Sequence, residues 1–124
     1  MWPVLAVAAS CAAWHPAAAG FYTGTVISSG TTQTMDTWIT LEDDGRLSGR
    51  YVLHEAARDV PGTLEMVADD GCNTTLFRWT DLYGTGVERL QFFPAEHCFE
   101  GTWGQLVLNP QFTIGTCNRS KVTS

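Results

Sequence analysis

The chain has few basic side chains. Its 124 residues include seven Lys and Arg against 13 Asp and Glu, which gives a formal net charge of −6 at pH 7. Nucleic-acid binding requires clustered Lys and Arg that neutralise phosphates, and anionic membrane surfaces attract the same clusters. Because the basic residues here are scattered, the composition argues against both kinds of partner.

Charged side chains are absent from the first nineteen residues, which contain eight alanines. Ala17-Ala18-Ala19 before Gly20 matches a small-residue cleavage pattern. We therefore expect residues 1–19 to be a secretory signal peptide, and residues 20–124 to be one secreted or periplasmic domain.

Two features of this leader leave alternatives open. No Lys or Arg precedes its apolar run, which a true start upstream of Met1 would explain, and the run is too short to span a bilayer stably. Ala8-Ala9-Ser10-Cys11 is also a weak lipoprotein-type signal, which would anchor the chain through an acylated Cys11.

Helical periodicity is absent from the rest of the chain, where Thr, Val, Phe, Trp and Tyr are plentiful. Short alternating runs recur about every dozen residues between turn signals, a pattern typical of strands. We expect eight strands, over 21–28, 36–42, 46–55, 62–68, 73–83, 86–93, 98–107 and 111–117. The predicted fold is all-β, a single antiparallel up-and-down eight-stranded barrel, which leaves room for packed side chains or one small ligand.

Turn chemistry gives registers for two hairpins. A three-residue Asp43-Asp44-Gly45 loop places Trp38 opposite Arg50 on the outer face and Ile39 opposite Gly49 on the inner face. A two-residue Gly84-Thr85 turn places Asp81 opposite Glu88, on the same face as Trp79. The second register also pairs apolar residues, namely Phe77 with Phe92, Trp79 with Leu90 and Leu82 with Val87.

A third hairpin follows the Asp69-Asp70-Gly71 turn and is ambiguous by one residue. A two-residue turn there places Leu64 opposite Phe77 and Gly62 opposite Trp79. A glycine that faces a tryptophan makes room inside a narrow barrel, so we prefer that register.

An up-and-down meander sorts its connections between two ends. One end carries the turns at 43–45 and 69–71 together with all three cysteines that follow the leader. The other end carries the segments 28–36 and 55–61, the Gly84-Thr85 turn and the Asn109-Pro110 turn. Longer loops make this second end the expected mouth of the barrel.

The cysteines that follow the leader are Cys72, Cys98 and Cys117. Cys98 begins the seventh expected strand and Cys117 ends the eighth, so antiparallel pairing predicts a disulfide between them, with Cys72 free or paired between chains. A zinc site with His97 as fourth ligand lacks a close Cys-x-x-Cys spacing. The acidic turns lack the full spacing of calcium loops, so we expect neither metal nor cofactor.

Asp44-Gly45-Arg46-Leu47-Ser48-Gly49-Arg50-Tyr51 resembles the Asp-Gly-x-Leu-x-Gly-x-Tyr segment of avidin and streptavidin. Gly24-Thr25 and Gly101-Thr102-Trp103 resemble the Gly-Thr-Trp elements of the wider calycin group, whose eight-stranded barrels bind small ligands in the mouth. The resemblance implies the barrel fold and a ligand-contacting role for Tyr51. Val26 and Leu53 stand where the family has a biotin-site tryptophan and serine, so biotin is not the predicted ligand.

The predicted function is a binding module that holds a small apolar or amine-bearing ligand in the barrel mouth. The expected ligand-binding residues are Tyr51, Trp79, Asp81, Tyr83, Glu88 and Trp103. Two carboxylates on an apolar face can hold an amine or share a proton. No Ser-His-Asp set or cysteine nucleophile accompanies them, so we expect no enzyme.

The alternative is a protein-interaction module, such as an inhibitor of a secreted enzyme. Trp38 and Arg50 would then form an outward interaction surface, with the guanidinium stacked on the indole ring. Asn73-Thr74-Thr75 and Asn118-Arg119-Ser120 fit the glycosylation sequon, which matters only in a eukaryotic secretory pathway.

Overall fold

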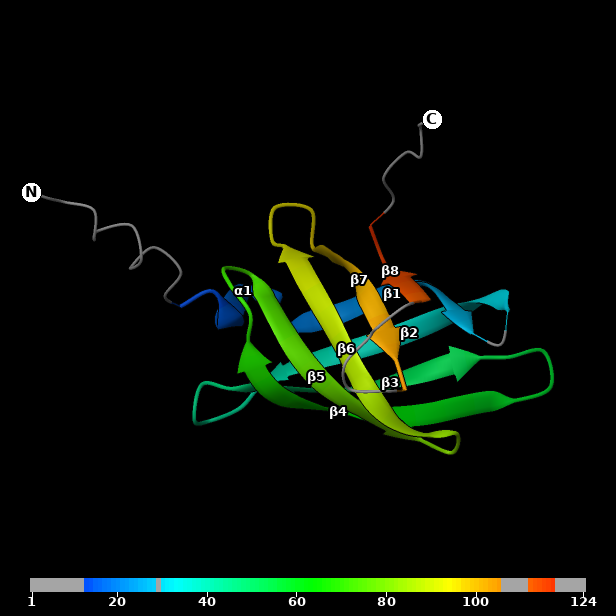
Figure 1. The fold of residues 1–124 in the computed structure, drawn as a ribbon. Coiled ribbons are helices and arrows are strands. Elements are labelled where there is room, and N and C mark those ends of the chain that lie inside the picture. The colour runs from blue at the N-terminus through cyan, green and yellow to red at the C-terminus, as the bar shows by residue number, and fades with distance from the viewer. Residues whose placement is uncertain (1–12, 29, 106–111, 118–124) are drawn as a thin grey trace, which may run out of the picture.

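The computed structural model describes residues 13–28, 30–105 and 112–117. Its strands form a closed antiparallel barrel in which each strand pairs with the next along the chain and β8 pairs with β1 (Figure 1). The strands are β1 (Gly20–Ser28), β2 (Thr31–Leu41), β3 (Leu47–His54), β4 (Asp59–Asp69), β5 (Thr74–Asp81), β6 (Gly84–Phe93), β7 (Cys98–Gly104) and β8 (Phe112–Gly115). The predicted all-β, up-and-down eight-stranded barrel is confirmed.

Alternating side chains build the barrel interior. In β4, Val60, Gly62, Leu64 and Met66 are buried, and the residues between them are exposed. This period of two is the consequence of successive side chains pointing to opposite faces of a strand. The largest fully buried side chains are Phe77, Phe92, Phe99, Leu47, Leu90 and Val60. Each such apolar side chain contributes roughly 1.5–3 kcal/mol when it is removed from water.

The β2–β3 hairpin follows the predicted register. Trp38 lies opposite Arg50 and Ile39 opposite Gly49. The backbone N–H of Glu42 donates to the Arg46 carbonyl over 2.8 Å and closes the turn. Gly45 has φ +87°, a conformation that glycine adopts without strain. The Asp43-Asp44-Gly45 sequence therefore predicted the turn and the register correctly.

The predicted register of the β5–β6 hairpin is wrong. The turn lies at Leu82 and Tyr83, so Asp81 pairs with Gly84 rather than with Glu88, and Glu88 pairs with Phe77. Asp81 Oδ1 accepts the backbone N–H of Tyr83 over 2.8 Å, an Asx turn that competes with the predicted Gly84-Thr85 turn. The observed and predicted registers differ by an even number of residues, so Asp81 and Glu88 both still face the barrel interior.

The β4–β5 register is also wrong, because the turn is longer than the expected two residues and a β-bulge precedes it. The Asp70 N–H donates to the Thr74 carbonyl over 2.8 Å, and the bulge lies between Met66 and Ala68. Trp79 pairs with Leu64 and Phe77 with Met66. The expected long loop over 28–36 is absent as well, since Ser28 already pairs with Thr31. The Thr-rich start of β2 extends the first hairpin instead.

The predicted disulfide between Cys98 and Cys117 is confirmed, with a Cα–Cα distance of 4.8 Å. The bond fastens the end of β8 beside the start of β7, and it indicates an oxidising compartment. The expectation that Cys72 is free is wrong, because it is also disulfide-bonded.

A short helix, α1 (His15–Ala18), precedes β1 and covers the end of the barrel that carries the β2–β3 and β4–β5 turns (Figure 1). We call this the α1 end, and the opposite end, with the Leu82–Tyr83 turn, the mouth. Among the described residues no helix is long and apolar enough to cross a membrane. The expectations for Met1, Cys11, Asn109-Pro110 and Asn118 fall outside the described residues.

Candidate functional site

A cavity of about 290 Å³ lies inside the mouth of the barrel. All six predicted ligand-binding residues line it, from β3, β5, β6, β7 and the Leu82–Tyr83 turn. The sequence reasoning did not select the remaining lining residues, which are Val26, Ser28, Met35, Leu53, Gln105, Phe112 and Ile114. The period-two alternation of β1, β2, β3 and β8 could have identified most of them as inward-facing.

Glu88 supplies a buried carboxyl group to the cavity wall. Its side chain is only 6 % exposed and lies between Phe77 and Trp103 across the two neighbouring strands. Among the described residues, no cation or hydrogen-bond donor contacts this carboxyl group, and burial raises its pKa to about 8. Glu88 is therefore largely protonated at pH 7 in the empty cavity.

Asp81 and Tyr51 form the second polar element of the cavity. The Tyr51 hydroxyl donates to Asp81 Oδ2 over 2.6 Å. Burial raises the pKa of Tyr51, and the hydrogen bond to Asp81 and the nearby Asp81 and Glu88 carboxylates raise it further. Tyr51 therefore stays a neutral donor committed to Asp81. The second oxygen of Asp81 accepts the Tyr83 N–H, so this carboxylate is held by two donors.

Two indole rings form an apolar wall. Trp79 and Trp103 meet edge to face with ring centroids 5.5 Å apart. The Trp79 indole N–H donates to the Gly104 carbonyl over 3.2 Å, and that of Trp103 to the Ile27 carbonyl over 3.0 Å. Since both polar atoms are satisfied within the barrel, the rings offer the cavity their hydrocarbon surface and π-faces.

Tyr83 links two connections at the mouth. Its hydroxyl lies 2.7 and 2.9 Å from the two carboxylate oxygens of Glu55, in the β3–β4 connection. The Arg58 guanidinium lies 6.0 Å from the Tyr83 ring centroid. Glu55 thus orients a cavity-lining side chain at the rim.

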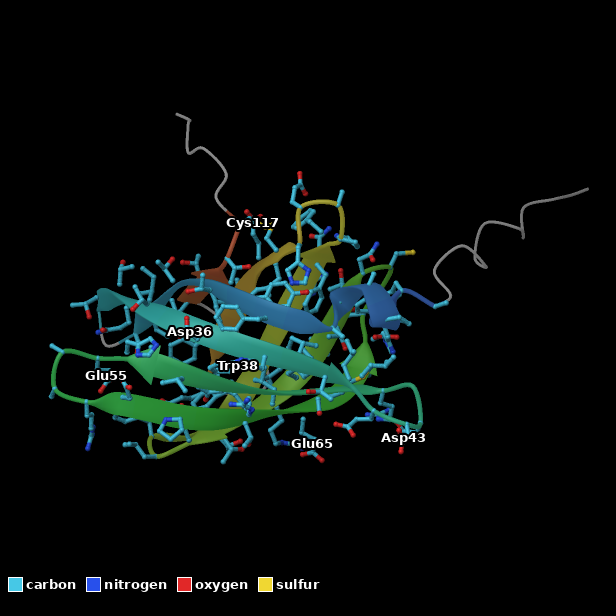
Figure 2. The ribbon with its side chains drawn as sticks, turned by 180° about the vertical axis from the view of Figure 1, so that it is seen from behind. Asp36, Trp38, Asp43, Glu55, Glu65 and Cys117 are labelled. Atoms are coloured by element: carbon cyan, nitrogen blue, oxygen red, sulfur yellow. A yellow bond between two sulfur atoms is a disulfide. The ribbon has the colours of Figure 1, made fainter. Side chains whose placement is uncertain are left out.

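The second predicted group, Trp38 and Arg50, lies on the outer face of β2 and β3 and not at the cavity (Figure 2). The Arg50 guanidinium carbon is 4.3 Å from the Trp38 ring centroid. Phe21 of the neighbouring strand β1 is 47 % exposed, and its ring centroid lies 5.2 Å from that of Trp38. The predicted stacking of arginine on the indole is present, extended by one aromatic residue that sequence reasoning did not select.

His54 joins three strands on the outer face near the mouth. Its Nε2 lies 3.0 Å from Asp36 Oδ2 and its Nδ1 lies 2.9 Å from Asp59 Oδ1. The hydrogen bonds to Asp36 and then to Asp59 raise the pKa of His54, because both partners accept only from a protonated ring nitrogen. The bond to His54 in turn lowers the pKa of Asp36.

We expect the imidazole of His54 to titrate above the usual histidine range. The raised folded-state pKa means that this contact stabilises the fold below about pH 6.5, the unfolded value, and that its contribution is lost as pH rises through the folded pKa. Histidine C–H chemical shifts across pH 5–9 measure the midpoint, and Asp36→Asn should lower it. Asp43→Asn is a matched control. Asp43 lies at the opposite end of the barrel from Glu55, the residue that follows His54 (Figure 2). Identical midpoints in wild type and Asp36→Asn would contradict the expectation.

Comparison with known proteins assigns no family. No family model, no curated protein and no solved structure matches the chain. Among the described residues, no three His, Cys, Asp or Glu side chains lie together so that they could hold a metal ion. The chemistry of the cavity is therefore argued from its own side chains.

Proposed function

We propose that this chain is a secreted or periplasmic binding module whose mouth cavity holds a small ligand with an apolar body and a basic nitrogen. The buried Glu88 carboxyl group carries the proposal. An uncompensated buried carboxyl lowers the stability of the empty protein at neutral pH, and such groups concentrate at functional sites. The disulfide supports the proposed compartment, since stable disulfides form under oxidising conditions.

The surroundings of Glu88 favour an amine over an anion. Glu88 and Asp81 are acceptors when ionised, and the hydroxyl of Tyr51 is already committed to Asp81. Among the described lining residues no Lys, Arg or His is present to hold an anion. The indole faces of Trp79 and Trp103 can contact either an apolar group or a cation. The cavity volume lies near the lower bound of ordinary ligand sites, which points to a compact ligand.

An ammonium group bound beside Glu88 would stabilise the ionised carboxylate. Since the carboxyl group is protonated in the empty cavity at pH 7, binding of the cation would release that proton. Affinity for an amine should therefore rise as pH increases towards 8 and then level off. Affinity for a neutral ligand should not follow this profile.

Three probes of similar size test the proposal by calorimetry and by tryptophan fluorescence, to which Trp79 and Trp103 of the cavity wall contribute. Phenethylamine should bind more tightly than phenethyl alcohol, and hydrocinnamate should bind weakest. The amine should bind roughly tenfold more tightly at pH 7.5 than at pH 6.5, the change that one coupled proton produces. Glu88→Gln should abolish this pH dependence without weakening the alcohol, and Glu65→Gln on the outer surface is the matched control. No preference for the amine, or the same pH profile in Glu88→Gln, would contradict the proposal.

A distant relationship to the avidin-like barrels is part of the same proposal. The eight-stranded meander and the position of Tyr51 in the cavity wall support it. Val26 and Leu53, which replace the family's biotin-contacting residues, also line the cavity, so we do not propose biotin as the ligand.

A second candidate function is protein interaction, such as inhibition of a secreted enzyme. The contacts of Trp38 with Phe21 and Arg50 on the outer face support it, because aromatic and arginine side chains are enriched at interfaces. Native mass spectrometry of material from the source organism distinguishes the candidates. A small molecule that co-purifies favours the first, and a partner chain that is lost in Trp38→Ala favours the second.

A further inference from the structure

We propose that α1 stays in the mature domain as a plug of the barrel's α1 end. Any leader that is removed would then be cut before Trp14, in place of the boundary at Gly20 that the sequence predicts. The proposal rests on the contacts of α1, independently of the ligand proposal.

The packing of α1 is that of a core element. Ala18 is only 1 % exposed, and it belongs to the same apolar cluster as the barrel interior. Trp14 packs against that cluster, with its ring centroid 5.8 Å from the centroid of Phe92. A chain that began at Gly20 would lose these contacts and would expose the interior at this end of the barrel.

A buried hydroxyl depends on the same segment. The Tyr22 side chain is 3 % exposed, and its hydroxyl donates to the Ala18 carbonyl over 2.5 Å. Burial raises the pKa of Tyr22 to about 12, so it remains a donor at neutral pH. Removal of Ala18 would leave this donor without its partner, a costly arrangement for a buried polar group.

His15 fastens α1 to two turns. Its Nδ1 lies 2.7 Å from the Gly45 carbonyl oxygen, and its Nε2 lies 3.0 Å from each carboxylate oxygen of Asp69. Burial alone would lower the pKa of His15, but the bonds to Asp69 and Gly45 outweigh it and raise the pKa. His15 therefore ties α1 to both the β2–β3 turn and the end of β4 at the β4–β5 turn.

The decisive experiment expresses the full chain with export to an oxidising compartment and examines the purified monomer. We expect an intact mass that includes Trp14 and the whole of α1, and N-terminal sequencing should find a first residue at or before Trp14. An N-terminus at Gly20 would overturn the proposal.

A variant pair tests whether the packing of α1 stabilises the barrel. Trp14→Ala should lower Tm by about 5 °C or more, the shift that a loss of roughly 1 kcal/mol produces in a domain of this size. Leu82→Ala is the control, because Leu82 is 55 % exposed at the mouth and should leave Tm unchanged. Equal Tm values for Trp14→Ala and wild type would show that α1 does not close the barrel.

Discussion

Glu88→Gln is expected to raise the free energy of unfolding by about 3 kcal/mol at pH 7, because a difference of one pKa unit is worth about 1.4 kcal/mol. In the folded protein burial raises the pKa of Glu88 to about 8, against an ordinary value of 4.5. The folded state therefore retains a proton that the unfolded chain gives up, and this difference destabilises the fold at neutral pH. Glutamine has nearly the same shape and no charge to bury, so it removes the penalty.

The sign of the pH dependence follows from the same values. The penalty is absent below the unfolded pKa of about 4.5, grows as pH rises from there to about 8, and is constant above the folded pKa. Urea denaturation of wild type and Glu88→Gln should therefore coincide near pH 4 and diverge by pH 7. Glu65→Gln, on the outer surface, is the matched control and should follow wild type at both pH values. A loss of stability in Glu88→Gln, or a pH-independent gain, would contradict the assignment.

Gly62→Ala is expected to destabilise the fold by about 3 kcal/mol, the upper part of the usual range for overpacking a core. A Cβ at position 62 would lie 2.1 Å from Tyr51 Cζ and 2.4 Å from its hydroxyl oxygen. Tyr51 would have to leave its position and give up the hydrogen bond to Asp81. The substitution should therefore weaken the fold and disturb the cavity together.

A double-mutant cycle measures this contact. In a Tyr51→Ala background the added methyl group meets no ring, so Gly62→Ala should cost little there, and the coupling should be at least about 1 kcal/mol. Gly115→Ala is the control, since its Cβ would meet nothing closer than 3.5 Å. Equal costs of Gly62→Ala in both backgrounds would contradict the close packing.

The sequence predicts inward and outward faces better than it predicts strand partners. Alternation in β4 and β6 assigns each side chain to a face, and an even register error preserves that assignment. Glu88 and Asp81 therefore reach the same cavity even though they are not cross-strand neighbours. The expected pairing of a glycine with a large ring is also present, but Gly62 faces Tyr51, and Gly86 is the residue beside Trp79.

The β5–β6 turn, the β4 bulge and α1 were not predicted from the sequence, because several local structures compete at each of these places. At the β5–β6 turn, the Asp81 side chain stabilises a turn at Leu82 and Tyr83 over the glycine-containing alternative. The bulge after Met66 carries no glycine or proline to indicate it. An alanine-rich apolar segment is equally consistent with a leader and with a buried helix, so α1 required the three-dimensional contacts of Trp14 and Ala18 to be recognised.

The barrel closes where its first strand, β1, pairs with its last strand, β8, and we call this pairing the seam. Among the described residues, β1 and β8 are paired through Thr25 with Gly115 and Val26 with Ile114, a shorter ladder than that of β1 with β2. The Cys98–Cys117 bond holds β8 beside β7 next to this seam. Reduction would remove this tether and leave β8 held by its pairing with β7 and β1 alone. If β8 detached, β1 and β7 would present unpaired backbone groups, the edges through which sheets from different molecules associate. The disulfide thus opposes exposure of these edges as well as unfolding.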